Sequence, residues 1–184
     1  MKNTKVTLVP LTEDDREQVI LDNQWAFKYG ALMEFGERDD HIDGDGEIIS
    51  RRTIERCIDD PQNETYRILL NGRIVGGLIL KIDRETNRNH LEILFTSPKE
   101  HSKGIGYAAW QAVEALYPET EVWETCTPYF EKRNIHFYVN KCGFQITEFW
   151  CEHFRPEHGD PCDEDHDPDE GPDEMFRFIK VMKH

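Results

Sequence analysis

The segment from Leu94 to Tyr107 reads LFTSPKEHSKGIGY and combines, in order, a strand, a short loop and the start of a helix. Gly104 and Gly106 lie where the loop meets the helix. Glycine lets a backbone approach a ligand closely, and the N–H groups at a helix N-terminus point toward an anion. The segment therefore predicts a binding loop for a pyrophosphate group. The alternative is a glycine-containing turn that only starts a helix.

Two other phosphate-binding patterns fit this segment poorly. A P-loop requires the pattern GxxxxGK[ST], which the segment lacks. Gly104, Gly106 and Ala109 nominally satisfy the Rossmann fingerprint, but that motif follows its strand in a tight turn. Here seven residues separate Thr96 from Gly104, and the strands upstream form hairpin patterns. A Rossmann fold is therefore disfavoured.

The apolar periodicity predicts a mixed α+β fold of the α/β class with hairpins, without the regular alternation of a doubly wound sheet. Asn71-Gly72 between two apolar runs is typical of a type I′ hairpin turn. The expected strands are Val6–Leu11, Tyr66–Leu70, Ile74–Ile82, His90–Thr96, Glu121–Cys126, one opened by Gly143-Phe144, and Met175–Val181. The expected helices run from Thr12 to Gly30 with an extension to Phe35, then over Ser50–Ile58, Tyr107–Leu116 and Glu131–Lys141. The predicted order is β-α-α-β-β-β-α-β-α-β-β.

Two blocks of the sequence resemble one family. The segment Phe95–Gly106 is similar to the pyrophosphate-binding motif [V]-x-P-x-x-[RQ]-G-x-G-x-[GA] of the GNAT superfamily of acyl-CoA N-acyltransferases. Thr96, His101 and Ser102 stand where that motif has Val, Arg or Gln, and Gly. Residues 134–144 (NIHFYVNKCGF) resemble the downstream N…FY…GF signature at the expected distance. The resemblance implies a single GNAT-like acetyltransferase domain over residues 1–184, with a central mixed, largely antiparallel sheet flanked by helices. It also implies an acidic loop insertion at about 152–174.

The resemblance implies acetyl-CoA as the acyl-donor cosubstrate. Main-chain atoms of Phe95 and Thr96 would pair with the pantetheine arm, and Asn134 would hydrogen-bond the CoA arm unless it is a helix N-cap. The N–H groups of the loop and helix start would hold the pyrophosphate, and they belong to Ser102, Lys103, Gly104, Ile105, Gly106 and Tyr107. Lys103 would add a positive charge near a phosphate or remain a solvated lysine.

The implied reaction is direct attack of a primary amine on the acetyl thioester in a ternary complex. Tyr138 would protonate the leaving thiolate as a general acid, the alternative being an ordinary core aromatic. A lysine-like amine has a pKa of about 10.4, so only roughly one molecule in 2,500 is uncharged at pH 7. Glu92 is the expected base, directly or through water, and His90 and Glu124 are its rivals.

Charge and composition limit the classes of partner that this protein is expected to bind. The chain has 184 residues, with 22 Lys+Arg, 37 Asp+Glu and a net charge of -15. Such an acidic protein is a poor partner for nucleic acid or an anionic membrane surface. The N-terminus lacks the apolar region of a signal peptide, and the five cysteines fit reduced thiols, so we expect a cytoplasmic protein.

The acceptor is expected to be an amine of a small molecule or a peptide, and cationic. The resemblance implies an acceptor site built from the first two helices and the loop before the last strand. The region of the first two helices offers aromatic and acidic side chains for it, which are Trp25, Phe27, Tyr29, Glu34, Phe35, Glu37 and Asp39. Ten acidic residues between Glu157 and Glu174 would favour a cation too, unless this segment is only a solvated loop. The resemblance also allows a homodimer in which the final strand takes part.

Other classes of protein and other kinds of site fit the sequence less well. One alternative is a noncatalytic acyl-CoA-binding or sensing domain, and another is an interaction module that binds a basic partner through the acidic loop. Cys126 and Cys142 are interpreted as buried small residues without a histidine partner rather than as nucleophiles. No metal is expected, because the spacing of Cys151, His153, His158, Cys162 and His166 matches no closed zinc site.

Overall fold

The structure is a computed structural model that describes residues 5–35, 47–100, 103–151, 153–154 and 174–183. For residues 31–35 it describes the backbone alone. The acidic insertion predicted at about 152–174 therefore lies almost entirely outside the described residues. The chain divides into two compact units, residues 1–83 with 91–118 and residues 84–90 with 119–184. One domain over the whole chain stays a prediction.

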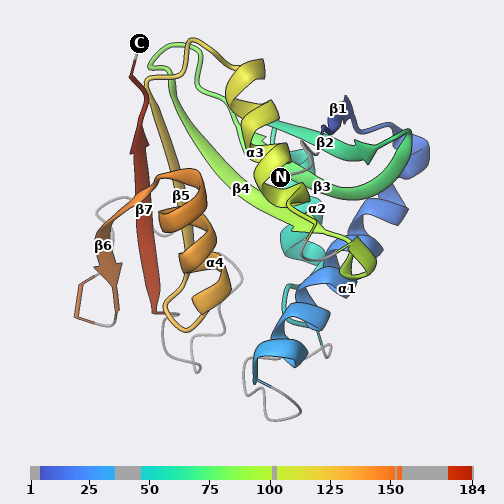
Figure 1. The fold of residues 1–184 in the computed structure, drawn as a ribbon, viewed down its shortest axis with the longest axis horizontal. Coiled ribbons are helices and arrows are strands. Elements are labelled where there is room, and N and C mark those ends of the chain that lie inside the picture. The colour runs from blue at the N-terminus through green and yellow to red at the C-terminus, as the bar shows by residue number, and fades with distance from the viewer. Residues whose placement is uncertain (1–4, 36–46, 101–102, 152, 155–173, 184) are drawn as a thin grey trace. The chain divides into compact units, whose positions relative to one another are not determined.

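The first unit carries the N-terminal helices and a hairpin (Figure 1). Its elements are β1 (Thr7–Pro10), η1 (Glu13–Asp15), α1 (Arg16–Phe35), α2 (Arg51–Asp59), β2 (Asn63–Leu70), β3 (Arg73–Lys81), most of β4 (Arg88–Thr96), η2 (Pro98–Glu100) and α3 (Ile105–Leu116). β1 pairs with β2 and β2 with β3, both antiparallel. Asn71 and Gly72 have φ angles of 52° and 78°, as a type I′ turn requires.

The second unit contains the C-terminal strands and a short helix that continues as a π-helix. Its elements are the first residues of β4, β5 (Val122–Pro128), α4 (Lys132–His136), the π-helix η3 (Phe137–Cys142), β6 (Gln145–Trp150) and β7 (Met175–Val181). β4 pairs with β5 in parallel, whereas β7 is antiparallel to both β5 and β6. The hydrogen-bonded strand order is β1-β2-β3-β4-β5-β7-β6. The predicted fold class and element order are confirmed.

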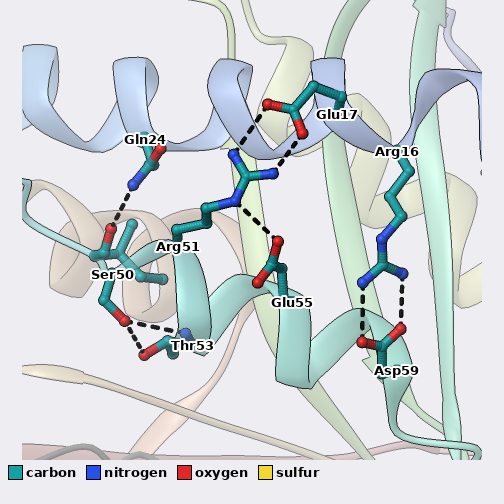
Figure 2. A network of polar contacts seen from close by, with 9 residues as sticks. Arg16, Glu17, Gln24, Ser50, Arg51, Thr53, Glu55 and Asp59 are labelled. Atoms are coloured by element: carbon teal, nitrogen blue, oxygen red, sulfur yellow. Dashed lines mark hydrogen bonds and ion pairs between the residues drawn. The ribbon is translucent and has the colours of Figure 1, made fainter.

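The helices α1 and α2 share one buried apolar core with β4. Val19 and Ile20 of α1 and Ile54 of α2 are buried together with Ile93 and Phe95 of β4. Figure 2 shows the polar contacts between the two helices, including Arg16 to Asp59 at 2.7 and 2.9 Å and the pair of Arg51 and Glu17. The Ser50 hydroxyl accepts the Thr53 N–H and so caps α2. These exposed ion pairs contribute little, so burial of the apolar side holds α1 and α2 in place.

A buried arginine of β2 pairs with acidic residues of η1 and α1. Arg67 is on β2, and its side chain is only 3% exposed. Its Nε is 2.7 Å from an oxygen of Asp15, and its Nη2 is 2.6 Å from an oxygen of Asp22. Because a buried charge without a counter-charge is costly, this arginine depends on both carboxylates.

Gly76 allows β3 to approach β4 closely. A Cβ at this position would lie 2.3 Å from the Phe95 carbonyl oxygen, so Gly76→Ala requires the backbone to shift. We expect this substitution to lower the free energy of unfolding by about 2–3 kcal/mol, the upper part of the range of about 1–3 kcal/mol for overpacking. Gly72→Ala is the control, because its Cβ would meet nothing within 4 Å and only the positive φ of 78° is strained, at about 1 kcal/mol. Equal losses in urea denaturation would contradict the crowding argument.

Candidate active site

The loop after β4 leads into α3, whose first N–H groups precede the first intrahelical hydrogen bond. Gly104 is the N-cap of α3 in the left-handed conformation, with φ 74° and ψ 13°. The first intrahelical bond runs from the Ala108 N–H to the Gly104 carbonyl at 3.0 Å. The N–H groups of Ile105, Gly106 and Tyr107 therefore have no acceptor within the helix. Such N–H groups can bind an anion at a helix N-terminus, and the role of these residues toward a pyrophosphate stays a prediction.

Charged side chains of the loop are paired with one another. Lys103 Nζ lies 2.7 Å from a Glu100 oxygen, and Arg73 lies 3.8 Å from the other oxygen of the same carboxylate. The hydrogen bond from Lys103 lowers the pKa of Glu100, so this carboxylate remains charged. Lys103 is thus an ion-paired residue of the loop, whichever role it has toward a phosphate. The prediction for Ser102, and the substitution at His101, lie outside the described residues.

One aromatic side chain of the predicted acceptor region contacts the loop. Trp25 is 44% exposed, and the Lys99 ammonium of η2 lies 5.6 Å from the centre of its ring. This cation–π contact connects α1 to η2. Phe27 and Tyr29 are partly buried, whereas nothing is described for the side chains of the other four predicted acceptor residues, Glu34, Phe35, Glu37 and Asp39.

The end of β4 alternates between buried and half-buried side chains, as predicted. Phe95 is buried against the core of α1 and α2, whereas Thr96 and Glu92 are half-buried. Side chains alternate along a strand, so Glu92 lies on the opposite face from Ile93 and Phe95. The strand ends where the Ser97 N–H donates to the Val75 carbonyl at 2.7 Å.

Tyr138 lies in the π-helix η3 and is 8% exposed. Its ring packs against those of Phe137, Phe144 and Phe178, with centroids 5.4, 5.7 and 5.4 Å away. Burial raises the pKa of Tyr138, although a hydrogen bond with the Thr125 side chain opposes the rise. The phenol therefore remains protonated throughout the neutral pH range, which a proton donor requires.

Asn134 is not a helix N-cap, because α4 begins after Glu131. The Asn134 amide nitrogen instead donates to the Thr127 hydroxyl at 3.2 Å. Thr127 is on β5, so this contact fixes the asparagine against the strand that precedes it. The alternative interpretation of Asn134 as a cap is therefore wrong, and its role toward CoA stays a prediction.

Glu124, one of the two rival bases, forms ion pairs with two arginines. Its oxygens lie 2.5 Å from Arg88 and 2.6 Å from Arg177, and Arg177 also pairs with Glu148. Burial raises the pKa of Glu124, but the hydrogen bonds from Arg177 and Arg88 lower this pKa by more than burial raises it, so the net shift is downward. A carboxylate held in this way is a poor proton acceptor. Arg177 was missed in the sequence, although a charged residue inside the apolar strand Met175–Val181 indicates a paired charge.

The other rival base has an unexpected neighbour. His90 Nε2 lies 3.9 Å from the Cys126 sulfur, and both residues are half-buried. The expectation that Cys126 is a buried residue without a histidine partner is therefore wrong. The sequence did not reveal this contact because it depends on the parallel register of β4 and β5, in which His90 lies opposite Glu124, two residues before Cys126. Cys142 is buried, as expected.

In the described part of the chain, neither metal-binding groups nor membrane-spanning helices are found. None of its His, Cys, Asp and Glu side chains form a group of three or more that could hold a metal ion. His158, Cys162 and His166 lie outside the described residues. Among the described helices, none is long and apolar enough to cross a membrane.

Comparison with known proteins identifies the family. The model of the acetyltransferase (GNAT) family matches residues 24–144, and the chain belongs to this family. It is 43% identical over 180 residues to the uncharacterized protein YrkN of Bacillus subtilis (strain 168), covering 97% of this chain and 95% of that protein.

Solved structures share the fold at low sequence identity. An acetyltransferase from Thermus thermophilus has a TM-score of 0.65 at 14% identity, covering 99% of this chain and 100% of that one. The PaiA N-acetyltransferase of Thermoplasma acidophilum in complex with coenzyme A has a TM-score of 0.62 at 17% identity, covering 97% and 99%. Spermidine N-acetyltransferase of Vibrio cholerae with CoA and spermine has a TM-score of 0.63 at 14% identity, covering 97% and 96%.

The resemblance to the GNAT superfamily is thereby confirmed. Family membership supports an acyl-CoA-dependent N-acetyltransferase with acyl-CoA as its cosubstrate.

Proposed function

We propose that this protein transfers an acetyl group from acetyl-CoA to a primary amine of a small molecule or peptide. The observation that carries the proposal is the start of α3, where Gly104 adopts φ 74° and the following N–H groups have no intrahelical acceptor. These groups, with the main chain of Phe95 and Thr96 and the Asn134 amide, are the proposed contacts to the cofactor. Three or more N–H donors aimed at one anion are what a pyrophosphate needs.

The chemical steps use two side chains. Glu92 accepts a proton from the amine, directly or through water, and the amine nitrogen forms a bond to the thioester carbonyl carbon. When the tetrahedral intermediate collapses, the carbon–sulfur bond breaks and Tyr138 donates its phenolic proton to the sulfur. The nitrogen, now bonded to the acyl carbon, loses its second proton, which returns to Tyr138 through solvent. The CoA thiol has a pKa of about 8.5 by analogy with cysteine, so protonation helps it to leave. The products are an acetamide and free CoA, without a covalent enzyme intermediate on this path.

The proposed acceptor carries a positive charge before it reacts. Trp25 supports this choice, because its half-exposed ring already contacts the Lys99 ammonium. Aromatic faces attract ammonium groups of lysines and of ligands in the same way. The cytoplasmic location and the homodimer remain predictions from the sequence.

Calorimetric titration with acetyl-CoA, with NAD as the control, tests the loop. We expect saturable binding of acetyl-CoA and none of NAD. Absence of acetyl-CoA binding would contradict the assignment of residues 102–107 to pyrophosphate.

Glu92→Gln tests the base. We expect kcat to fall by roughly 10²-fold at pH 7, the usual effect of a general base, with the Kd of acetyl-CoA unchanged. The neutral fraction of the amine rises about tenfold per pH unit below its pKa, so the deficit should shrink between pH 7 and pH 9. A purely structural defect would stay constant over this range.

His90→Gln, assayed in parallel, distinguishes Glu92 from its rival base His90. If it shows the pH-dependent deficit and Glu92→Gln does not, the base is His90 and the present assignment is wrong. Glu124→Gln is a less suitable comparison, since it also disturbs the pairing with Arg88 and Arg177.

A further inference from the structure

Cys126 and His90 form a thiol–imidazole contact within the second unit. Cys126 is on β5 and His90 on β4, and the Cys126 sulfur lies 3.9 Å from His90 Nε2. The parallel register pairs His90 with Glu124, two residues before Cys126, so these three side chains extend from one face of the two strands. The steps proposed for amine acetylation do not use this thiol, which leaves it available for chemistry of a different kind.

Charged side chains around the contact balance one another. Arg177 of β7 is the register partner of Cys126, which brings their Cβ atoms to about 4.5–5.5 Å from each other. Arg177 is paired with Glu124 and with Glu148 of β6, and Arg88 of β4 is paired with Glu124. These two arginines and two glutamates carry no net charge together. The imidazole is therefore the group in contact with the thiol that can take its proton.

Contact with an imidazole favours the thiolate form of a cysteine. An ordinary cysteine has a pKa of about 8.5, so only about 3% of it is thiolate at pH 7. Transfer of the thiol proton to a neighbouring imidazole leaves a thiolate beside an imidazolium, and the opposite charges stabilise each other. Glu92 follows His90 by two residues on the same face of β4, and its carboxylate can only stabilise that imidazolium. The thiolate is the form that attacks electrophiles.

Exposure alone does not distinguish Cys126 from other cysteines. Among the described residues, Cys126, Cys57 and Cys151 are half-buried, whereas Cys142 is buried. A small reagent can reach a half-buried sulfur, and a cysteine buried in apolar surroundings is inert. If exposure decided reactivity, the three half-buried cysteines would react alike. The imidazole contact instead predicts that Cys126 reacts fastest.

We propose that Cys126 is a site of reversible oxidation by hydroperoxides. His90 Nε2 takes the thiol proton, and the thiolate attacks one oxygen of hydrogen peroxide. A sulfur–oxygen bond forms as the oxygen–oxygen bond breaks, and the departing hydroxide takes the proton from His90 to become water. The sulfur loses two electrons, which reduce the peroxide, and the product is a sulfenic acid. A small thiol then displaces this hydroxyl as water, and a second thiol molecule restores Cys126 and releases the small-molecule disulfide.

The test is incubation of the reduced protein with hydrogen peroxide and dimedone, which traps sulfenic acids. Mass spectrometry of peptides then follows each of the five cysteines separately. We expect dimedone first on Cys126, and without dimedone we expect a small thiol to remove the added oxygen. Cys126→Ala should abolish the fast label. Cys57→Ala and Cys151→Ala are the matched controls, because they remove cysteines that are also half-buried and should keep the label on Cys126.

His90→Gln tests the imidazole. It should slow labelling of Cys126 by roughly tenfold at pH 7, because only about 3% of an unassisted thiol is ionised there. The difference should disappear by about pH 9.5, where an ordinary thiol is mostly ionised as well. A variant that only altered access to the sulfur would be slower by the same factor at every pH. Thermal unfolding shows whether the variant is folded.

Iodoacetamide alkylation of the wild-type protein is a second measurement that needs no variant. The alkylation rate at Cys126 should reach its plateau at a lower pH than the rates at Cys57 and Cys151. Equal rates at the three cysteines, an unchanged rate in His90→Gln at pH 7, or oxidation that a thiol does not reverse would overturn the inference. No step involves acyl-CoA or an amine, so these outcomes leave the proposed function standing, and absence of acetyl-CoA binding leaves this inference standing.

Discussion

Tyr138→Phe is expected to lower kcat for amine acetylation by roughly 10²-fold while the Kd of acetyl-CoA stays unchanged. The substitution keeps the ring that packs between Phe137, Phe144 and Phe178, and removes only the hydroxyl. Losing the hydrogen bond with Thr125 should cost about 1 kcal/mol of stability, which leaves the protein folded. The measurements are steady-state kinetics and a calorimetric titration of the same preparation.

Tyr129→Phe is the matched control. Tyr129 also belongs to the second unit, but it is 47% exposed, and its ring contacts Phe130 and Phe149 edge-on. Removing this hydroxyl should leave kcat unchanged. An unchanged kcat in Tyr138→Phe would mean that Tyr138 is a core aromatic and that the sulfur leaves without its help.

The pH profile gives an independent check on the same residue. Burial raises the pKa of Tyr138 above the usual value of about 10, so the phenol remains a proton donor up to at least that pH. The native state favours the neutral phenol, and stability from this group is complete below pH 10 and falls as the pH rises further. We therefore expect no loss of wild-type activity from Tyr138 between pH 7 and pH 9.

The double substitution Asp15→Asn with Asp22→Asn is expected to lower the free energy of unfolding by about 3–5 kcal/mol. It leaves Arg67, only 3% exposed, without either of the carboxylates that lie 2.7 and 2.6 Å from it. An uncompensated buried charge is among the most destabilising changes a core can receive. Urea denaturation monitored by tryptophan fluorescence provides the measurement.

Adding Arg67→Met to this double variant should restore most of the lost stability. Methionine fills a similar volume and has no charge, and replacing a buried ion pair by apolar residues is often neutral. If the triple variant is as unstable as the double variant, the loss came from packing at Asp15 and Asp22 rather than from the charge of Arg67.

Much of this architecture follows from local sequence signals. Asn71-Gly72 sets the hairpin because its backbone needs positive φ angles, and Ser50 marks the start of α2 because its hydroxyl caps the helix. The alternation from Leu91 to Thr96 identifies β4 in the same way. Gly104 and Gly106 located the start of α3 because a helix beginning in a left-handed residue favours glycine. Each of these signals is carried by residues a few positions apart.

The unpredicted features all depend on residues far apart in the sequence. The contact of His90 with Cys126 joins residues 36 positions apart and exists only because β4 and β5 pair in one register. Arg177 binds Glu124 across 53 positions for a similar reason, and this contact removes Glu124 as a base. Alternation within a strand shows which side chains share a face, but it does not show which strand lies next to it.

The strand order has a consequence for synthesis of the chain. β7 lies between β5 and β6, although it follows both in the sequence. During vectorial synthesis, residues 122–128 and 145–150 leave the ribosome before their shared hydrogen-bonding partner at 175–181 exists. The segments of the first unit, which end at residue 118, are complete much earlier. Nascent chains should therefore gain protease resistance in two steps, and a chain truncated before residue 175 should keep its second unit exposed to chaperones and proteases.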